Sequence, residues 1–408
     1  MLKEQQIQII KSTAPVLREY GTQITTRFYN LLFENHPELL NIFNQANQKQ
    51  GKQQQALANS IIAAAENIEQ LEEIIPVVEK IAHKHRSIGV KPEHYPIVGE
   101  NLLQTIADVL KENATEEILN SWKEAYNVIA DIFIDLEANM YEQAENQNGG
   151  WSNFKDFYIA KKVKESDVIT SFYLKPADEE PLPSFNPGQY ISLKISIPEE
   201  TYTHVRQYSL SNSPGEAHFR ISVKRESDDE PNGIASNYLH DSLNIGDLIP
   251  VSAPAGDFTL DLTNHRPLVL IGGGVGVTPM MSMLHTVTKE HPNRPVTFIH
   301  AAKNSKIQAF KAEVENTLLN NNHLNVLTVY SEATEQDQSE NNFTEEGYIS
   351  YSWLKQNIRN LNSDFYFCGP KPFMQNVMHA LLELGASPEQ INYEFFGPKE
   401  DLPQPTTV

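Results

Sequence analysis

The spacing of apolar residues divides the chain into three parts. From residue 1 to about 147, apolar positions recur every three or four residues without strand-like alternation, which predicts helices throughout. From Trp151, short β-branched runs such as GQYISLKI and FRISVKR alternate with Pro, Gly, Ser and Asn clusters, a pattern typical of strands and tight turns. After Pro267, apolar strands alternate with helices, which predicts a parallel sheet. We therefore expect domains at 1–147, 151–261 and 262–408, the first all-α and the last α/β.

Composition indicates an ordinary globular protein. Its 408 residues exceed the size at which a single core usually stops growing, so two or three domains are expected. Apolar residues make up 40% and charged residues 21%, and no apolar run approaches the roughly 18 residues of a membrane helix. The first residues lack the basic start, apolar core and cleavage site of a secretory signal. We expect a cytoplasmic protein without integral membrane association, acting as a monomer.

Charge and cysteine content narrow the possible chemistry. A net charge of −21 disfavours nucleic acid as a partner, because phosphate binding requires a basic face. Cys368 is the only cysteine, which excludes an intrachain disulfide, a cysteine-based zinc site and an iron–sulfur cluster. Any metal must therefore be held by histidine or carboxylate, or arrive within a cofactor.

Three of the 13 histidines lie within the stretch EKIAHKHRSIGVKPEHY. On a helix, His83 and His85 point about 200° apart and cannot face one pocket. Apolar positions at i, i+3, i+4 and i+7 place His85 on the buried stripe, whereas His83 falls on the polar side. His94 is predicted to be solvated in the loop before the next helix. A histidine on an apolar stripe is more often a hydrogen-bonded core residue than a ligand, and both interpretations stay open.

Two later helices offer polar partners for this histidine. Tyr95 starts the apolar stripe of one helix, and Glu137 interrupts the apolar stripe of the last one. A carboxylate on such a stripe is costly to bury without a donor, so Glu137 should pair with a tyrosine or a histidine. A chain of carboxylate, phenol and imidazole would orient a metal-bound histidine and raise its electron donation. The alternative is a hydrogen-bonded cluster that only holds the helices together.

Residues 1 to about 147 resemble a bacterial globin. The resemblance rests on the order of an aromatic pair in TRFYNLLF, a phenylalanine in the following corner, a glutamine and leucine four residues apart, and the histidine of the buried stripe. It implies a b-type haem with His85 as the proximal ligand. Tyr29 and Gln53 would line the distal pocket, with Leu57 as its apolar wall.

The same resemblance implies roles for residues around the haem. Tyr95 and Glu137 match the pair that the family places behind the proximal histidine. Lys84 is either a charge that influences the haem potential or a solvated lysine. The haem-pocket residues expected in addition to the distal pair are Phe28, Phe43, Leu57 and Lys84.

The motif VRQYSLS resembles the Arg-x-Tyr-Ser strand of ferredoxin-reductase-type flavoproteins. Arg206 can pair with a pyrophosphate, Tyr208 can stack on a flat ring and Ser209 can offer a hydroxyl to a ring nitrogen. Such a tetrad arises easily by chance, but NPGQY, NGIASNYL and YEFFGP supply the family's context. The resemblance implies an antiparallel β-barrel that binds FAD. Its expected FAD-binding residues are Tyr190, Arg206, Gln207, Tyr208, Ser209, Gly233, Ser236, Phe395, Phe396, Gly397 and Pro398.

Phe395 stands where some relatives of this flavoprotein family carry a cysteine. Phe396 and the Gly-Pro pair that follows are retained. The change therefore affects only the fine tuning of the flavin potential.

The segment VLIGGGVGVTP is a strand, a glycine loop and a helix start. Glycines let the backbone approach a diphosphate, and a helix N-terminus favours the anion; we expect Thr278 as N-cap and Pro279 in the first turn. The loop resembles the reductase family's Gly-x-Gly-x-Thr-Pro, and FYFCGPKPFM resembles its Cys-Gly-Pro loop, although Cys368 is equally compatible with an inert buried cysteine. The expected nicotinamide-binding residues are Gly273, Gly274, Val275, Gly276, Val277, Thr278, Pro279, Cys368, Gly369 and Pro370.

Taken together, the three parts resemble the flavohaemoglobin family. The resemblance implies nitric oxide dioxygenase activity, with electrons passing from NAD(P)H to FAD and then to haem b, and nitric oxide and oxygen as substrates. Tyr29 would donate a hydrogen bond to bound oxygen with help from Gln53. His85, polarised through Tyr95 and Glu137, would supply electron density from the other side.

Two alternatives to this activity remain open at the level of sequence. One is a haem-based hydroperoxide reductase that uses the same electron chain. The other is a non-enzymatic sensor or store of oxygen or nitric oxide, which the flavin and nicotinamide motifs disfavour. The choice between NADH and NADPH is also open, because Lys303 in HAAKNS is the one residue that suggests an extra phosphate.

Overall fold

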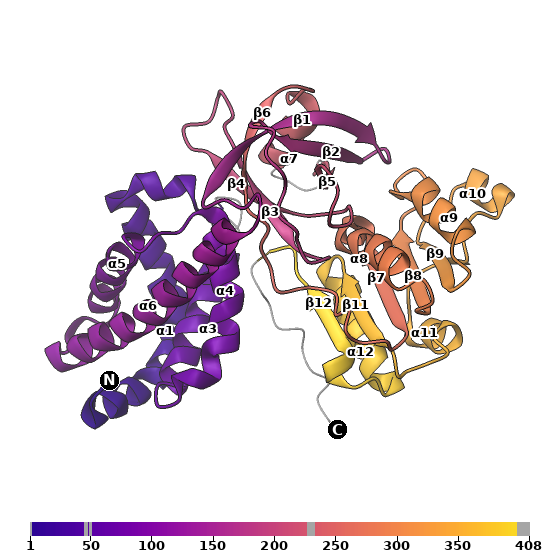
Figure 1. The fold of residues 1–408 in the computed structure, drawn as a ribbon. Coiled ribbons are helices and arrows are strands. Elements are labelled where there is room, and N and C mark those ends of the chain that lie inside the picture. The colour runs from indigo at the N-terminus through magenta and orange to yellow at the C-terminus, as the bar shows by residue number, and fades with distance from the viewer. Residues whose placement is uncertain (1, 45–47, 49–50, 227–232, 398–408) are drawn as a thin grey trace. The chain divides into compact units, whose positions relative to one another are not determined.

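The computed structural model describes residues 2–44, 48, 51–226 and 233–397 (Figure 1). The chain forms two compact units. The first comprises Met1–Lys155, Ser192–Arg206 and Pro250–Ala255, and the second comprises Asp156–Ile191, Gln207–Ile249 and Gly256–Val408. No helix within the described ranges is long and apolar enough to cross a membrane.

The first part of the chain is helical, as its apolar spacing predicts. Thr115 caps the last helix by accepting a hydrogen bond from the Ile118 N–H at 3.3 Å. Gly89, with φ of +82°, ends the helix that carries His85. The helices are α1 (Glu4–Asn35), η1 (Pro37–Asn41), α3 (Lys52–Glu66), η2 (Leu71–Ile74), α4 (Ile75–Ile88), α5 (His94–Leu110), η3 (Lys111–Asn113) and α6 (Glu116–Asn146).

The first unit has a core at which α1, α5 and α6 meet. Phe28, Leu32 and Ile106 are at most 2% exposed, and Trp122 donates its indole N–H to the Thr13 hydroxyl at 3.1 Å. A buried indole N–H needs such a partner. The apolar stripes of these helices therefore face one another, as their periodicity predicts.

Within the same unit, the helical part contacts two strand-forming segments. The Arg86 guanidinium donates to the Pro254 carbonyl at 2.5 Å. Asn41 accepts a hydrogen bond from the Thr203 N–H at 2.9 Å. Both contacts join a side chain of a helix end to backbone outside the helical region.

The second part of the chain is a six-stranded antiparallel sheet in the order β4-β3-β6-β1-β2-β5. A bridge between Leu210, just after β4, and Ile221 on β5 joins the two edge strands, which closes the sheet into the expected barrel. The elements are β1 (Phe154–Lys164), β2 (Ile169–Pro176), β3 (Tyr190–Ile195), β4 (His204–Ser209), β5 (Phe219–Lys224), α7 (Ile234–Asp241) and β6 (Leu248–Ser252).

The third part is a parallel sheet in the order β10-β9-β8-β7-β11-β12, with helices between its strands, as the βαβ pattern predicts (Figure 1). Its strands are β7 (Leu268–Gly273), β8 (Val296–Ala302), β9 (Leu324–Tyr330), β10 (Glu345–Glu346), β11 (Asp364–Cys368) and β12 (Ile391–Glu394). Its helices are η4 (Gly274–Gly276), α8 (Val277–Glu290), α9 (Lys311–Leu319), α10 (Glu335–Glu340), α11 (Tyr351–Asn357), α12 (Lys371–Leu384) and η5 (Pro388–Gln390).

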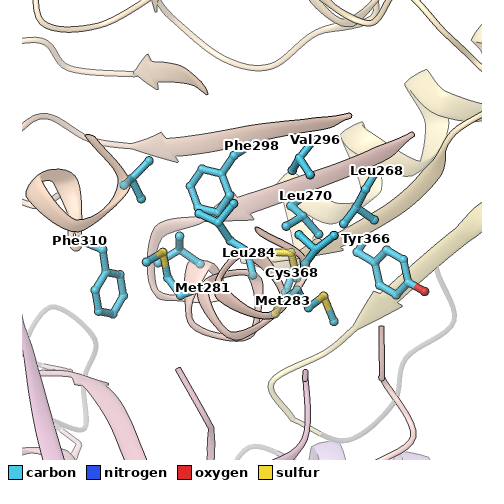
Figure 2. Packing of buried hydrophobic residues seen from close by; sticks show 14 of the residues in the cluster. Leu268, Leu270, Met281, Met283, Leu284, Val296, Phe298, Phe310, Tyr366 and Cys368 are labelled. Carbon is cyan, nitrogen blue, oxygen red and sulfur yellow. The ribbon is translucent and has the colours of Figure 1, made fainter. Parts of the chain in front are cut away.

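Alternate residues of the parallel strands fill two cores. Leu268, Leu270 and Phe298 point toward α8 (Figure 2). Their neighbours Val269 and Ile271 belong to the core on the other face, which includes residues of α11 and α12. Strands that are buried on both faces carry apolar residues at every position. This part of the sequence therefore lacks the alternation of apolar and polar residues.

A buried ion pair links two strands of the parallel sheet. Arg294 donates to the Asp364 carboxylate at 2.9 Å, and the two side chains are 2% and 7% exposed. Arg294 also donates to the carbonyl oxygens of Arg266 and Asp261. Each of the three guanidinium nitrogens thus donates a hydrogen bond just before β8, and the charge is compensated at the first residue of β11.

We predict that Asp364→Ala destabilises the parallel-sheet region by about 3–5 kcal/mol, because it leaves the Arg294 charge buried and unpaired. Hydrogen exchange of the β11 and β7 amides measures this loss region by region, which a multidomain chain requires. Asp167→Ala is the control, since its pair with Lys164 is exposed and should matter little. Equal exchange in Asp364→Ala and the native protein would contradict the prediction.

Candidate functional site

His85 lies in a polar cluster made by three helices of the first unit. Its Nδ1 is 2.8 Å from Glu137 Oε1 and 3.2 Å from the Tyr95 hydroxyl oxygen. Tyr95 donates its hydroxyl to the same Glu137 oxygen at 2.7 Å. The carboxylate can only accept, so Nδ1 carries a proton, and in the neutral imidazole Nε2 is the nitrogen with the lone pair. The structure brings together the three residues that the apolar stripes predicted.

Burial and charge act strongly on this cluster. Glu137 is 3% exposed, so its carboxylate depends on its two donors for compensation. Burial first, and then the Glu137 charge, raise the pKa of Tyr95, so the phenol keeps its proton. The His85 side chain is 31% exposed, and its ring packs against Phe133 with centroids 5.6 Å apart. One side of the imidazole is fixed and the other is open.

Of the two neighbouring histidines, His83 and His94, only His94 differs from its expected environment. His83 is half-buried on α4. His94 was expected to be solvated in a loop, and this is wrong: it is the first residue of α5 and is half-buried. The reason is local, because its Nδ1 accepts a hydrogen bond from the Lys91 N–H at 3.1 Å and so turns the ring back onto the chain. Burial lowers the pKa of His94.

Tyr29 on α1 lies in a cluster of aromatic rings. Its ring contacts Phe28 and Phe43 edge-on, with centroids 5.0 and 5.8 Å apart. Burial raises the pKa of Tyr29, while interactions with the Gln48 and Gln53 side chains act to lower it. The phenol therefore stays protonated, with two amide side chains beside it. The sequence pattern identified Gln53 but not Gln48, which shares no helix stripe with the pocket.

The remaining predicted pocket residues lie in the same unit. Leu57, one turn after Gln53 on α3, packs against the helical core. Gln53 Oε1 is buried and has no hydrogen-bond partner among the described residues. Lys84 is half-buried next to His85, and its carbonyl accepts from the Ser87 hydroxyl at 2.8 Å. Its influence on a haem stays a prediction.

These residues fit a haem. An imidazole with a free Nε2 suits an iron ligand, the aromatic rings suit a porphyrin, and a buried amide oxygen without a partner suits a pocket built for a further group. Within the described part of the chain, no three His, Cys, Asp or Glu side chains come close enough to hold a metal ion.

The backbone of Gly256 closely approaches the ring of Tyr190, the tyrosine predicted to flank the flavin. Tyr190 begins β3, and a Cβ on Gly256 would stand 2.9 Å from its ring. Gly256 has φ of +111°, a conformation that favours glycine. The Gln189 amide donates to the Gly256 carbonyl at 3.2 Å and holds this turn. The GDF turn thus packs its glycine directly against the Tyr190 ring.

The VRQYSLS motif forms β4, as expected. Ser209 is buried, whereas Arg206, Gln207 and Tyr208 are half-buried, and Arg206 Nη1 donates to the Val205 carbonyl at 2.9 Å. A half-buried guanidinium beside a half-buried phenol suits a diphosphate joined to an aromatic ring.

Gly233 is the N-cap of α7, and the Ser236 hydroxyl donates to its carbonyl at 3.0 Å. A Cβ on Gly233 would lie 2.6 Å from Ser236 Oγ, so glycine is required at this helix start. The Ser236 hydroxyl also accepts from the Glu226 N–H at 3.2 Å. The helix start is therefore held by its own side chain.

The C-terminal motif follows β12. The Phe395 ring meets Tyr393 edge-on at 5.8 Å, and Phe396 is 50% exposed. The Gly397 N–H donates to the Phe395 carbonyl at 3.0 Å. The predicted residue Pro398 lies outside the described residues.

The glycine loop and the Cys-Gly-Pro loop are brought together at the ends of β7 and β11. A Cβ on Gly276 would lie 2.3 Å from the Cys368 carbonyl oxygen, and one on Gly369 would lie 2.6 Å from the Phe373 ring. Gly273 is equally close to that ring, at 2.8 Å. These glycines are needed for loop-to-loop packing. The Gly273–Gly276 stretch and Gly369 therefore meet at one edge of the sheet.

Two details of this region correct or refine the expectations. Thr278 is not the N-cap of α8, because the η4 turn leads into a helix that starts two residues earlier than expected, at Val277, with Gly276 as N-cap. The Thr278 hydroxyl donates to the Val275 carbonyl at 3.0 Å. Pro279 does lie in the first turn. Pro370 is the N-cap of α12. Cys368 is fully buried, and burial raises the pKa of its thiol.

Comparison with known proteins follows this division of the chain. Three family models match: Globin over residues 26–133, Oxidoreductase FAD-binding domain over 156–260 and Oxidoreductase NAD-binding domain over 270–379. Proteins named "Flavohemoprotein" are similar over nearly the whole length. That of Bacillus thuringiensis subsp. konkukian is 55% identical over 403 residues, covering 98% of this chain and 100% of its own. That of Bacillus subtilis is 55% identical over 407 residues, covering 99% and 100%.

Solved structures agree with these matches. The flavohemoglobin of Malassezia yamatoensis, with bound FAD and heme, is 28% identical with a TM-score of 0.84, covering 97% of this chain and 100% of that one. The FAD/NAD-binding domain of nitric oxide dioxygenase from Vibrio cholerae is 36% identical with a TM-score of 0.55, covering 60% of this chain and 99% of that one.

We predict that Glu137→Gln retains haem but weakens electron donation by His85, because a neutral amide polarises the Nδ1 proton less than a carboxylate does. Resonance Raman spectroscopy of the ferrous protein should show a lower iron–histidine stretching frequency. Asp131→Asn on the exposed face of α6 is the matched control. An unchanged frequency in Glu137→Gln would refute the role of the carboxylate.

Proposed function

Because the chain belongs to the flavohaemoprotein family, we propose that it is a nitric oxide dioxygenase that converts nitric oxide and oxygen to nitrate. Haem, FAD and a nicotinamide dinucleotide are the cofactors of its three domains, and the chain is an oxidoreductase. The observation that carries the proposal is the hydrogen-bonded cluster of His85, Tyr95 and Glu137. Similarity of the reductase region to that of the Vibrio cholerae nitric oxide dioxygenase supports the choice of reaction.

His85 would hold the haem iron through Nε2. When bound, haem supplies an iron centre for oxygen and nitric oxide, and FAD takes two electrons from the nicotinamide and releases them singly. The Glu137 carboxylate stabilises the proton on His85 Nδ1, at 2.8 Å, which makes Nε2 the stronger donor. Tyr95 uses its own hydroxyl on the same carboxylate and so prevents Glu137 from turning away.

A globin that only stores oxygen has no need of this donation. A strongly donating histidine would favour charge on the substrate, and Tyr29 would act as a donor to that charge. The cluster therefore supports a reaction in preference to reversible binding.

On the distal side, Tyr29 would donate its hydroxyl to the oxygen substrate. The raised pKa keeps the proton on the phenol, so the donor is present throughout the physiological pH range. Phe28 and Phe43 hold the ring by edge contacts, and a preorganised donor of this kind contributes a few kcal/mol at developing charge. Gln53 would assist from α3.

The reductase residues would bind the two dinucleotides. Arg206 would pair with the FAD pyrophosphate, Tyr208 and Tyr190 would flank the flavin ring, and Ser209 would bond to a ring nitrogen. The glycine loop before α8 would receive the nicotinamide dinucleotide through its N–H groups. The buried Cys368, whose thiol keeps its proton, would contribute shape and no nucleophile.

We predict that Tyr29→Phe retains haem and FAD but releases oxygen about ten-fold or more faster and lowers nitric oxide turnover, because the donor to the oxygen substrate is lost. Flash photolysis or stopped-flow of the oxygenated protein measures the release. Tyr20→Phe, on the same helix and 37% exposed, is the control. Unchanged oxygen release would remove Tyr29 from the mechanism.

The reaction itself is tested by the yield of nitrate per NADH consumed, with nitric oxide and oxygen both supplied. Electron counting requires two nitrates per NADH, since one hydride supplies two electrons. His85→Ala, which should keep FAD and lose natively ligated haem, is the negative control. NADH oxidation that depends on an organic hydroperoxide, with no nitrate from nitric oxide, would instead identify a hydroperoxide reductase and overturn the proposal.

A further inference from the structure

His300 is a buried histidine beneath the glycine loop of the parallel sheet. It lies on β8, is 2% exposed and stands opposite Gly272 of β7 in the strand register. Side chains alternate along a strand, so His300 shares a face with Val296 and Phe298, whose side chains point toward α8 (Figure 2). The imidazole therefore lies on the α8 side of the sheet, next to the residues that connect β7 to α8.

Glycine at position 272 brings α8 close to this histidine. A Cβ on Gly272 would lie 2.7 Å from the Val277 Cα. The start of α8 thus rests directly on the strand next to His300, and a large polar ring fills the neighbouring position.

The His300 ring donates a hydrogen bond to the first carbonyl of the loop. Nε2 lies 3.3 Å from the Gly274 carbonyl oxygen, and because a carbonyl only accepts, Nε2 carries the proton. Nδ1 is buried and has no hydrogen-bond partner within the described ranges. Burial lowers the pKa of His300 to about 4, so the ring is neutral near pH 7. The histidine holds one tautomer with a single directed N–H.

The peptide between Gly274 and Val275 carries this contact to the other side of the loop. In a trans peptide, the carbonyl of one residue and the N–H of the next point in opposite directions. Since the Gly274 carbonyl accepts from His300, and also from the Val277 N–H, the Val275 N–H points away from the imidazole. Gly274 has φ of +55°, and glycine alone does not enforce one orientation of its peptide.

We propose that His300 is a positioning residue for the nicotinamide dinucleotide, which it serves by fixing the Gly274–Val275 peptide so that the Val275 N–H faces the diphosphate. The inference rests on the proposed use of this loop for dinucleotide binding and adds the residue that orients it. An N–H already directed at the anion binds without a prior rearrangement of the loop. The expected effect is on dinucleotide affinity, and not on hydride transfer once the dinucleotide is bound.

Three substitutions of His300 separate this hydrogen bond from packing. His300→Gln places an amide N–H near the position of Nε2, whereas His300→Asn places one only near Nδ1, too short to reach Gly274. His300→Leu removes both. Phe298→Leu is the control, because it changes volume on the same strand face and in the same core but removes no hydrogen-bond donor.

Anaerobic stopped-flow reduction of FAD in the holoenzyme gives the apparent Kd for NADH, and separately for NADPH, together with the limiting rate of hydride transfer. We expect His300→Asn and His300→Leu to raise the Kd on the order of ten-fold, with the limiting rate within about two-fold. His300→Gln and Phe298→Leu should stay near the native value. Hydrogen exchange of the Val275 and Val277 amides, without dinucleotide, should be faster in the Asn and Leu variants alone.

The outcomes separate the two proposals. If neither NADH nor NADPH reduces FAD in the native protein, the proposed function fails independently of His300. If the native protein is reduced and the Gln and Asn variants bind NADH equally well or equally poorly, the hydrogen bond to Gly274 has no positioning role and the inference is overturned. If His300→Leu does not fold, the comparison of Gln with Asn still decides.

Discussion

The buried carboxylate of Glu137 is the constraint on which the first unit depends. A carboxylate that is 3% exposed on an apolar helix face must receive hydrogen bonds from within the protein, because an unpaired buried charge costs several kcal/mol. Its donors come from two other helices: Tyr95 from the first turn of α5 and His85 from the last turn of α4. Satisfying one charge therefore sets the relative positions of three helices. The same carboxylate accepts the Nδ1 proton of His85, so the contacts that hold the helices together also set the orientation of the imidazole that we propose as the iron ligand.

In the parallel sheet, close packing of glycine has the corresponding role. Gly272 and Gly273 end β7 on opposite faces, where added Cβ atoms would meet Val277 of α8 and Phe373 of α12 respectively. Two helices thus approach the end of β7. The loop that connects β7 to α8 contacts the Cys368 carbonyl at Gly276. A glycine run that resembles a flexible loop in sequence is, in the structure, a tightly packed connection. Gly272, Gly273 and Gly276 are closely packed, whereas a Cβ at Gly274 would meet nothing within 4 Å. The direction of the Gly274 peptide therefore depends on hydrogen bonds, including the one that its carbonyl accepts from His300.

The sequence predicted the parts of this architecture that depend on local periodicity. The helical stripes identified His85 and Glu137, and the change from strand alternation to continuous apolar runs separated the two sheets correctly. It could not identify contacts made across elements without a periodic signal. Gln48 reaches Tyr29 from outside any helix stripe, and His300 looks like one more residue of a buried strand until its register opposite Gly272 is known. Thr278 was misplaced because a 3-10 turn begins α8 early, and His94 because its ring turns back to the Lys91 N–H; both depend on backbone geometry at a helix start, where sequence patterns are least informative.

The two proposed sites share one feature: burial favours the neutral form of their hydrogen-bond donors. Burial raises the pKa of Tyr29 and of Tyr95 and lowers the pKa of His300 to about 4. In each case the neutral form is favoured, so each group keeps one proton at a fixed atom between about pH 6 and 9. The phenols of Tyr29 and Tyr95 and the His300 N–H that bonds to the Gly274 carbonyl therefore remain donors over this range. It follows that a pH dependence of turnover in this range would have to arise from groups other than these three, or from the substrates themselves.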